Sequence, residues 1–331
     1  MQKITREQLI AKASELLANS TVSCVLGWGK GEFGYDVTPT IFKNAEEMHN
    51  GFVYNSFSGA NFAKYLVSKT QKLEGKILVF LKPCDTYSFN QLLTEHRFDR
   101  EKVYAVGIPC EGMVDISKIK AVCDGITSVS ENDDGIIVES IYSDTPVTVS
   151  AEDVLLERCI NCKSKKHVAY DELLGEDGDV VESARFDEVA RIEAMTPDER
   201  FAFWQNELSK CIRCNACRDA CPACTCEKCV FDNPGSGVEN KSPANSFEEK
   251  MFHIIRAFHV AGRCTDCGEC SRVCPQNIPL HLLNRKFIKD MNEFYGEYQA
   301  GAEVGARAPL VNYTTEDLEP GEVFDRRDDN A

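Results

Sequence analysis

The chain has 331 residues, of which 43% are hydrophobic, and this composition is typical of a folded protein of about two domains. Its formal charge of −16 argues against binding to nucleic acid or to anionic membrane surfaces, because both need a positively charged face. No apolar run reaches the roughly 18 residues of a membrane-spanning helix, and the N-terminus lacks a secretory signal, so we expect a cytoplasmic protein.

Helical and strand patterns alternate at the start of the chain, which predicts an α/β domain over residues 1–170. Apolar side chains recur at helical spacing in residues 1–20, and two further helices are expected at 59–70 and 86–96. Short apolar runs predict buried strands at 22–26, 77–81 and 103–108. Alternating apolar positions and turn residues at 125–149 indicate a small antiparallel addition.

A glycine-rich segment follows the first predicted strand and contains Gly27, Gly29, Gly31 and Gly34. One interpretation is a loop that contacts a flavin or a nucleotide phosphate. The segment lacks the spacing of a dinucleotide-binding fingerprint, however, and this favours the alternative of a mobile glycine loop.

Four cysteines of the N-terminal domain form a candidate metal site, which we call the third quartet: Cys84, Cys110, Cys159 and Cys162. Cys84 and Cys110 each follow a predicted strand, and the loops after neighbouring parallel strands converge. The Cys159-x-x-Cys162 pair would complete four thiolates for a 4Fe–4S cluster. In the alternative interpretation, the first two cysteines are structural and the later pair binds zinc or nothing.

The second half of the chain divides into three parts. Residues 171–200 are predicted to form an acidic linker followed by a helix, and helical character is expected over 187–209. Residues 201–295 are expected to form an α-helical domain, with one marked helix at 246–261. Residues 296–331 are acidic and rich in turn residues, so we expect an extended tail there.

Seventeen cysteines are too many for an ordinary core, and 11 of them lie between Cys211 and Cys274. Without a secretion signal, such clustering indicates metal binding and not disulfides. Cys24 and Cys123 stand alone in the sequence, and we expect them to be core residues.

Two cysteine runs repeat the spacing C-x-x-C-x-x-C-x-x-x-C-P, one from Cys211 and the other from Cys264. In bacterial ferredoxins with this spacing, three thiolates of one run and the fourth of the other hold each 4Fe–4S cubane. The predicted first quartet is therefore Cys211, Cys214, Cys217 and Cys274. The second quartet is Cys221, Cys264, Cys267 and Cys270. Two zinc sites are the alternative, but zinc is usually held by two pairs of ligands, which these runs do not provide.

Three more cysteines lie between the two runs: Cys224, Cys226 and Cys229. They are candidates for a further metal site or for free thiols with a redox role, because no fourth ligand is evident in the sequence.

The long gap between the runs, which contains a predicted helix, resembles the α-helical ferredoxin domains of heterodisulfide reductase and of succinate dehydrogenase iron–sulfur subunits. In the N-terminal domain, Pro83-Cys84-Asp85, Gly107-Ile108-Pro109-Cys110 and Cys159-x-x-Cys162 resemble the beta subunits of deazaflavin-coenzyme-reducing hydrogenases and related formate dehydrogenases. Several of those subunits bind FAD and pass a hydride to the deazaflavin coenzyme. The resemblance implies a flavin contact at Ser58 and Gly59.

From these patterns we predict an α/β domain followed by a mostly α-helical two-cluster ferredoxin domain. The expected function is relay of single electrons, and the resemblance implies that this relay operates within an anaerobic oxidoreductase complex. The resemblance also implies that the partners are other subunits of a flavin-containing redox complex, such as a heterodisulfide-reductase-like flavoprotein, a hydrogenase or a formate dehydrogenase subunit. Two alternatives are a catalytic FAD-containing subunit that exchanges hydride with a nicotinamide or deazaflavin coenzyme, and a redox sensor or scaffold.

Overall fold

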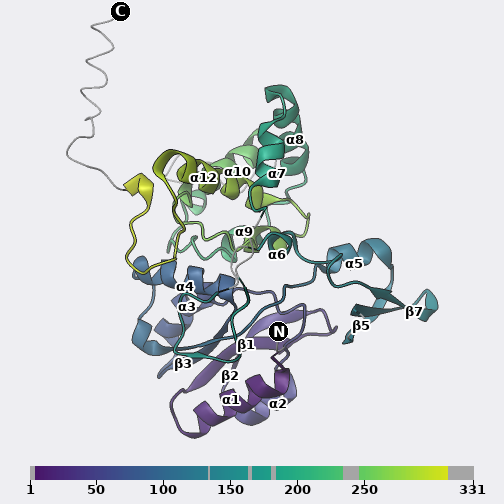
Figure 1. The fold of residues 1–331 in the computed structure, drawn as a ribbon, viewed down its shortest axis with the longest axis vertical. Helices are drawn as coiled ribbons and strands as arrows, with labels where there is room; N and C mark the ends of the chain where they lie inside the picture. Colours follow the sequence, from purple (N-terminus) through teal and green to yellow (C-terminus); the bar gives the residue numbers. More distant parts are fainter. Residues whose placement is uncertain (1–3, 133–134, 163–165, 180–183, 234–245, 312–331) are drawn as a thin grey trace, which may run out of the picture.

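The computed structural model describes residues 4–132, 135–162, 166–179, 184–233 and 246–311. It has an N-terminal α/β region and a C-terminal helical region, which lie one above the other in Figure 1. The predicted fold class is therefore confirmed. Within the described residues, no helix is both long and apolar enough to cross a membrane.

A five-stranded sheet forms the centre of the N-terminal region. In spatial order its strands are β2 (Val37–Phe42), β1 (Cys24–Lys30), β3 (Ile77–Leu81), β4 (Val103–Gly107) and β8 (Glu172–Leu173). Strands β1, β3, β4 and β8 run parallel, whereas β2 is antiparallel to β1. All five residues of β3 are buried, as a continuous apolar run predicts for a strand covered on both faces.

Helices cover the two faces of this sheet. Helices α1 (Arg6–Ala18) and α2 (Ala45–Gly51) lie on the face turned away from the helical region (Figure 1). Helices α3 (Ala63–Lys72) and α4 (Pro83–Thr94) lie on the opposite face, next to the helical region. Helix α4 begins directly after β3, and Pro83 suits its first turn because a helix needs no backbone donor there.

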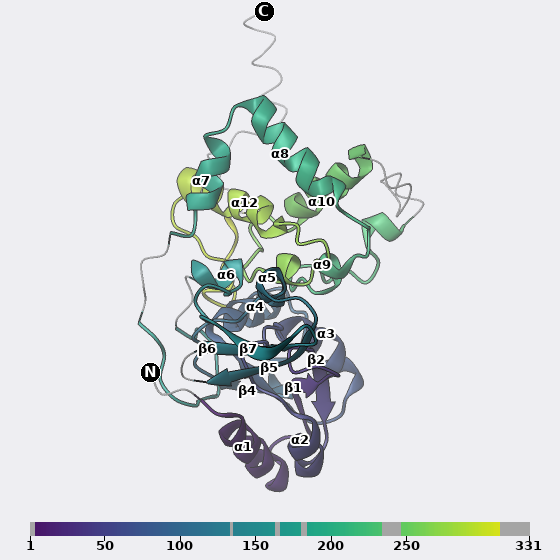
Figure 2. The same cartoon turned by 90° about the vertical axis from the view of Figure 1, so that its right-hand side faces the viewer.

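A second, three-stranded antiparallel sheet stands to one side of the main sheet (Figure 1), and it faces the viewer in Figure 2. It consists of β5 (Ile126–Asn132), β6 (Gly135–Ser140) and β7 (Ser143–Val149). Short helices precede and follow it, α5 (Ile116–Val122) and α6 (Glu157–Ile160). The antiparallel addition expected at 125–149 is thus confirmed.

The C-terminal region is built from helices joined by cysteine-bearing loops. Its elements are α7 (Asp187–Glu193), α8 (Pro197–Ser209), α9 (Ala216–Asp219), η2 (Val230–Asp232), α10 (Ser246–His259), α11 (Glu269–Arg272), α12 (Leu280–Tyr295) and η4 (Pro309–Val311). Helix α10 packs against α8 and α12. Apolar side chains from these helices and the cysteine loops form one core, which includes Leu208, Phe231, Phe252 and Leu280.

The structure corrects the expectation that the glycine segment follows the first strand, because Gly27 and Gly29 lie within β1 itself. A Cβ atom at Gly27 would lie 2.7 Å from the Phe52 ring, and one at Gly29 would lie 2.1 Å from Thr40 Oγ1. These glycines therefore allow neighbouring side chains to pack closely on the strand. Gly31 and Gly34 lie beyond β1, where Gly31 N–H donates to the carbonyl of Asp36 over 2.8 Å.

Two expectations for the middle of the chain also need correction. The predicted linker contains β8, which pairs with β4. This strand is too short for its residues to show the alternation of apolar and polar positions that predicts a strand. The helical pattern at 187–209 forms two helices, because Thr196 caps a new helix that Pro197 begins.

The first part of the predicted tail packs against both regions. Tyr298 Oη donates to the carbonyl of Gly262 over 3.0 Å, and Gly305 N–H donates to Thr94 Oγ1 over 2.9 Å. Gly301 has a positive φ of 76° and lies against the backbone of Tyr87, where a side chain would not fit. Residues 312–331 of the predicted tail lie outside the described residues.

Candidate metal centres

The four cysteines of the third quartet line one cavity at the carboxyl edge of the main sheet. Cys84 lies in the first turn of α4, directly after β3, and Cys110 follows β4. Cys159 belongs to α6, and Cys162 follows that helix. The sequence prediction that these side chains converge therefore agrees with the geometry.

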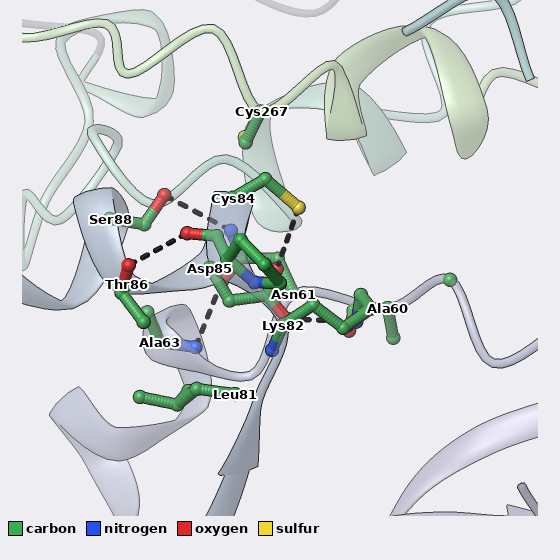
Figure 3. Close-up of polar contacts among 12 residues, drawn as sticks. Ala60, Asn61, Ala63, Leu81, Lys82, Cys84, Asp85, Thr86, Ser88 and Cys267 are labelled. Carbon is green, nitrogen blue, oxygen red and sulfur yellow. Dashed lines mark hydrogen bonds and ion pairs between the residues drawn. The ribbon is translucent and has the colours of Figure 1, made fainter. Parts of the chain in front are cut away.

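The same cavity is also lined by Cys267, a member of the second quartet from the helical region. Figure 3 shows Cys267 next to Cys84. The third quartet consequently lies at the boundary between the two regions, beside the second quartet.

A buried lysine supplies positive charge to this cavity. Lys82 is 0% exposed, and its Nζ lies 2.8 Å from Asp85 Oδ2 and donates to the carbonyl of Ala60 over 3.0 Å (Figure 3). Burial raises the pKa of the Cys110 thiol to about 11, and Lys82 acts in the opposite direction. A metal that binds thiolates would match this pocket of buried sulfur and fixed positive charge.

The first quartet lines a separate cavity in the helical region, and its members come from both cysteine runs: Cys211, Cys214, Cys217 and Cys274. This arrangement has the crossed pattern that the ferredoxin spacing predicts, because the last cysteine of the second run joins three from the first.

The second quartet is also brought together. Burial raises the pKa of Cys264 to about 12, and the charge of Cys221 contributes to this rise. Cys221 likewise contributes to the raised pKa of Cys267 and of Cys270, after the larger effect of burial. Cys221 and Cys264 also pack in one hydrophobic cluster with Ala223 and Val260, so Cys221 lies beside the start of the other run.

Polar hydrogen atoms point at several of these sulfurs. His253 Nε2 lies 3.3 Å from Cys211 Sγ, and Arg213 N–H donates to the same sulfur over 3.4 Å. Asn284 Nδ2 donates to Cys270 Sγ over 3.7 Å. Burial, together with Arg256, lowers the pKa of His253 to about 3, so its imidazole is neutral near pH 7. Sequence spacing gave no signal for His253 and Asn284, which lie 42 and 14 positions along the chain from the cysteines they contact.

Some buried donors near the quartets lack a partner among the described residues, and these include Arg158 Nε and Arg256 Nε. Buried donors are normally satisfied, so such atoms fit sites where sulfide and thiolate acceptors would be present. The donor chemistry around the quartets thus matches iron–sulfur clusters.

No group of three or more His, Cys, Asp or Glu side chains in the described part of the chain has the geometry to hold a single metal ion. A cubane differs from a single ion, because each thiolate binds a different iron atom at a separate corner.

The three additional cysteines do not form a compact group around one centre. Cys224 is hydrogen-bonded to Cys221, whereas Cys226 is exposed and Cys229 contacts Arg218. Their loop is held to the N-terminal region, because Lys64 donates to the carbonyl of Cys224 and Arg97 donates to that of Thr225.

The predicted flavin contacts are covered by protein. Ser58 is 0% exposed, and its Oγ accepts a hydrogen bond from Asn55 N–H over 3.0 Å. A Cβ atom at Gly59 would lie 3.1 Å from Arg272 and 3.3 Å from Arg158. The structure therefore packs this segment against α6 and the helical region.

Comparison with known proteins gives two kinds of similarity. Residues 207–278 match the family model of the 4Fe-4S dicluster domain. The beta subunits of two F420-dependent formate dehydrogenases, from Methanocaldococcus jannaschii and Methanococcus maripaludis, are each 25% identical to this chain. Both alignments cover 83% of this chain, and they cover 86% and 87% of the respective relatives. The chain is a relative of these beta subunits.

Of two further similarities, one covers a smaller part of the chain and the other has a low sequence identity and TM-score. The succinate dehydrogenase iron–sulfur subunit of Bacillus subtilis is 29% identical over 35% of this chain and 53% of that subunit. A chain of the F420-reducing [NiFe] hydrogenase complex from Methanosarcina barkeri has 13% identity and a TM-score of 0.37, covering 63% of this chain and 89% of that chain.

The region that matches the dicluster domain contains all eight cysteines of the first two quartets. The predictions of a beta-subunit relative and of an iron–sulfur protein are thus confirmed. The dicluster domain and the formate dehydrogenase relatives together support an electron-transfer role within an oxidoreductase complex.

Proposed function

We propose that the chain relays single electrons through three 4Fe–4S clusters, one in each cysteine quartet. The observation that carries this proposal is the position of Cys267, which belongs to the second quartet and also lines the cavity of the third. The three sites then form a series in which the second quartet lies between the other two.

Each bound cluster would supply the one-electron chemistry, and the protein would hold and insulate it. The cysteines would ligate the iron atoms. Buried side chains from Phe252, Leu280 and Ile278 would exclude water from the first site, and N–H groups such as that of His253 would stabilise thiolate charge.

The partner proposed for this relay is another subunit of a multisubunit oxidoreductase. Because the beta-subunit relatives are components of F420-dependent formate dehydrogenases, we propose a complex in which electrons are exchanged with a deazaflavin coenzyme. A hydrogenase or a heterodisulfide-reductase-like flavoprotein is an alternative partner of the same kind.

Metal analysis of anaerobically purified protein tests the number of clusters. Three cubanes predict about twelve irons and about twelve sulfides per chain. Cys110→Ser is expected to lower both to about eight, whereas Cys123→Ser, at a buried cysteine outside the quartets, is expected to keep about twelve. Wild-type protein with about eight irons would refute the third cluster, and zinc without sulfide would refute the relay.

A catalytic FAD-containing subunit is the second candidate, and one cavity favours it. This cavity of about 310 Å³ shares Gly112 and Met113 with the wall of the third-quartet cavity. A flavin bound there would lie beside a cluster. Acid treatment would then release a yellow chromophore, and its absence from complete, iron-loaded protein would contradict this candidate.

A further inference from the structure

A buried arginine joins the third quartet to the second. Arg158 precedes Cys159 of the third quartet in α6 and donates from Nη1 to the carbonyl of Cys267 over 2.5 Å. It also lies 2.6 Å from Glu269 Oε1 and donates from Nη2 to the carbonyl of Gly59 over 2.5 Å. One guanidinium therefore contacts a ligand-bearing residue of the second quartet and neighbours the third.

A second arginine occupies the equivalent place between the second and first quartets. Arg256, on α10, is 3% exposed and donates from Nη2 to the carbonyl of Cys217 over 3.2 Å. Its side chain is also hydrogen-bonded to the thiol of Cys270. Cys217 belongs to the first quartet and Cys270 to the second, so Arg256 contacts both.

The guanidinium groups of both arginines stay charged, because an arginine side chain is not deprotonated in proteins. The Glu269 carboxylate lies 2.6 Å from the guanidinium of Arg158. A fixed positive charge in a buried site interacts strongly with nearby charges because little water screens it. Reduction of a cluster adds one negative charge, which a nearby cation stabilises.

We propose that Arg158 is a positioning residue that holds a positive charge between the second and third clusters and raises the reduction potential of both. Arg256 has the same role for the first and second clusters. This inference rests on the proposed function, and it assigns each arginine to one junction of the electron path.

The carboxylate of Glu269 allows the direction of the shift in reduction potential to be tested. Its carboxylate is 2% exposed and is shared between Arg158 and Arg272. A negative charge at this position opposes reduction of the adjacent clusters. Glu269→Gln should therefore raise their potentials, whereas Arg158→Met should lower them.

The experiment is an anaerobic redox titration followed by EPR, with signals assigned from Cys110→Ser and Cys217→Ser proteins. In Arg158→Met, the reduced-to-oxidised ratio of the second and third clusters at a fixed potential should fall about tenfold, which equals about 59 mV for a one-electron couple. The first cluster should not shift. In Arg256→Met the first and second clusters should shift and the third should not.

Arg158→Lys keeps the charge and should retain potentials close to those of the wild type, which separates charge from hydrogen bonding. If Arg158→Met loses iron, Arg158→Lys and Glu269→Gln decide the question. The inference would be overturned if the potentials of all clusters shifted equally or if none shifted. It would also be overturned if Glu269→Gln lowered the potentials.

Iron and sulfide are measured first in wild-type protein. If only eight irons are present, the three-cluster proposal fails, and the shift of the second cluster still decides the role of Arg158. If sulfide is absent, both proposals are refuted. If all clusters are present and no potential shifts, only the role of the arginines is refuted.

Discussion

The hydroxyl of Ser88 in α4 lies 2.8 Å from the hydroxyl of Thr265, which follows Cys264 in the dicluster domain. Both side chains are buried. On the N-terminal side, Asn61 Nδ2 donates to Ser88 Oγ over 3.0 Å (Figure 3). A hydrogen-bonded chain thus crosses the boundary between the two regions next to a proposed cluster ligand.

Loss of this contact should weaken the attachment of the dicluster domain. Ser88→Ala and Thr265→Val are each expected to lower the free energy of unfolding by about 1 kcal/mol, because each removes the buried hydrogen bond. The double variant should lose less than the sum of the two, as expected for residues in contact. Thermal unfolding under anaerobic conditions measures the effect, with Ser68→Ala on the exposed side of α3 as the control. Additive losses would contradict the coupling.

Single cysteine replacements should remove individual clusters from the dicluster domain. Cys217→Ser and Cys270→Ser are each expected to lose about four irons, because each quartet then has only three thiolates. Both residues are buried in the core around the helices, so the domain should also become less stable. Cys24→Ser, in the core of the N-terminal region, should retain all its iron, and iron loss there would disprove the ligand assignment.

The imidazole of His253 should tune the first cluster. Its Nε2 lies 3.3 Å from Cys211 Sγ, and a hydrogen bond to a thiolate stabilises the added negative charge of the reduced state. His253→Leu is therefore expected to lower the potential of the first cluster alone in an EPR titration. His259→Leu, at an exposed position on the same helix, is the control. An unchanged potential in His253→Leu would argue against this hydrogen bond.

Stability should fall in mild acid because of a buried histidine in α12. Burial, with a smaller effect of Arg285, lowers the pKa of His281 from 6.5 to about 4. As pH falls below 6.5, the unfolded chain binds a proton at this site before the folded chain does, so stability is lost down to pH 4. Between pH 7.5 and pH 5 this loss amounts to about 2 kcal/mol. Thermal unfolding across this range should show a smaller loss in His281→Gln, and an identical loss would disprove the assignment.

The sequence predicted the parts of the site that depend on local pattern. Continuous apolar runs marked β3 and β4, and because parallel strands present their carboxyl ends at one edge, Cys84 and Cys110 were expected to meet. The ferredoxin spacing likewise indicated the crossed arrangement of the first two quartets.

Contacts between segments far apart in the chain leave no pattern in the local sequence. Arg158 and Cys267 are 109 positions apart, and nothing in the local sequence of either residue indicates their hydrogen bond. The role of Gly27 and Gly29 in β1 differs from the predicted loop for a related reason. It depends on the tertiary packing of Phe52 and Thr40 over the strand, which the local sequence does not indicate.

The loop at Cys224 and Thr225 is fastened to the N-terminal region by Lys64 and Arg97. A free ferredoxin must diffuse to its partner, and salt or dilution slows that encounter. A domain that is attached to the N-terminal region in this way needs no diffusional encounter. Electron exchange between the second and third quartets would therefore proceed at a rate independent of protein concentration.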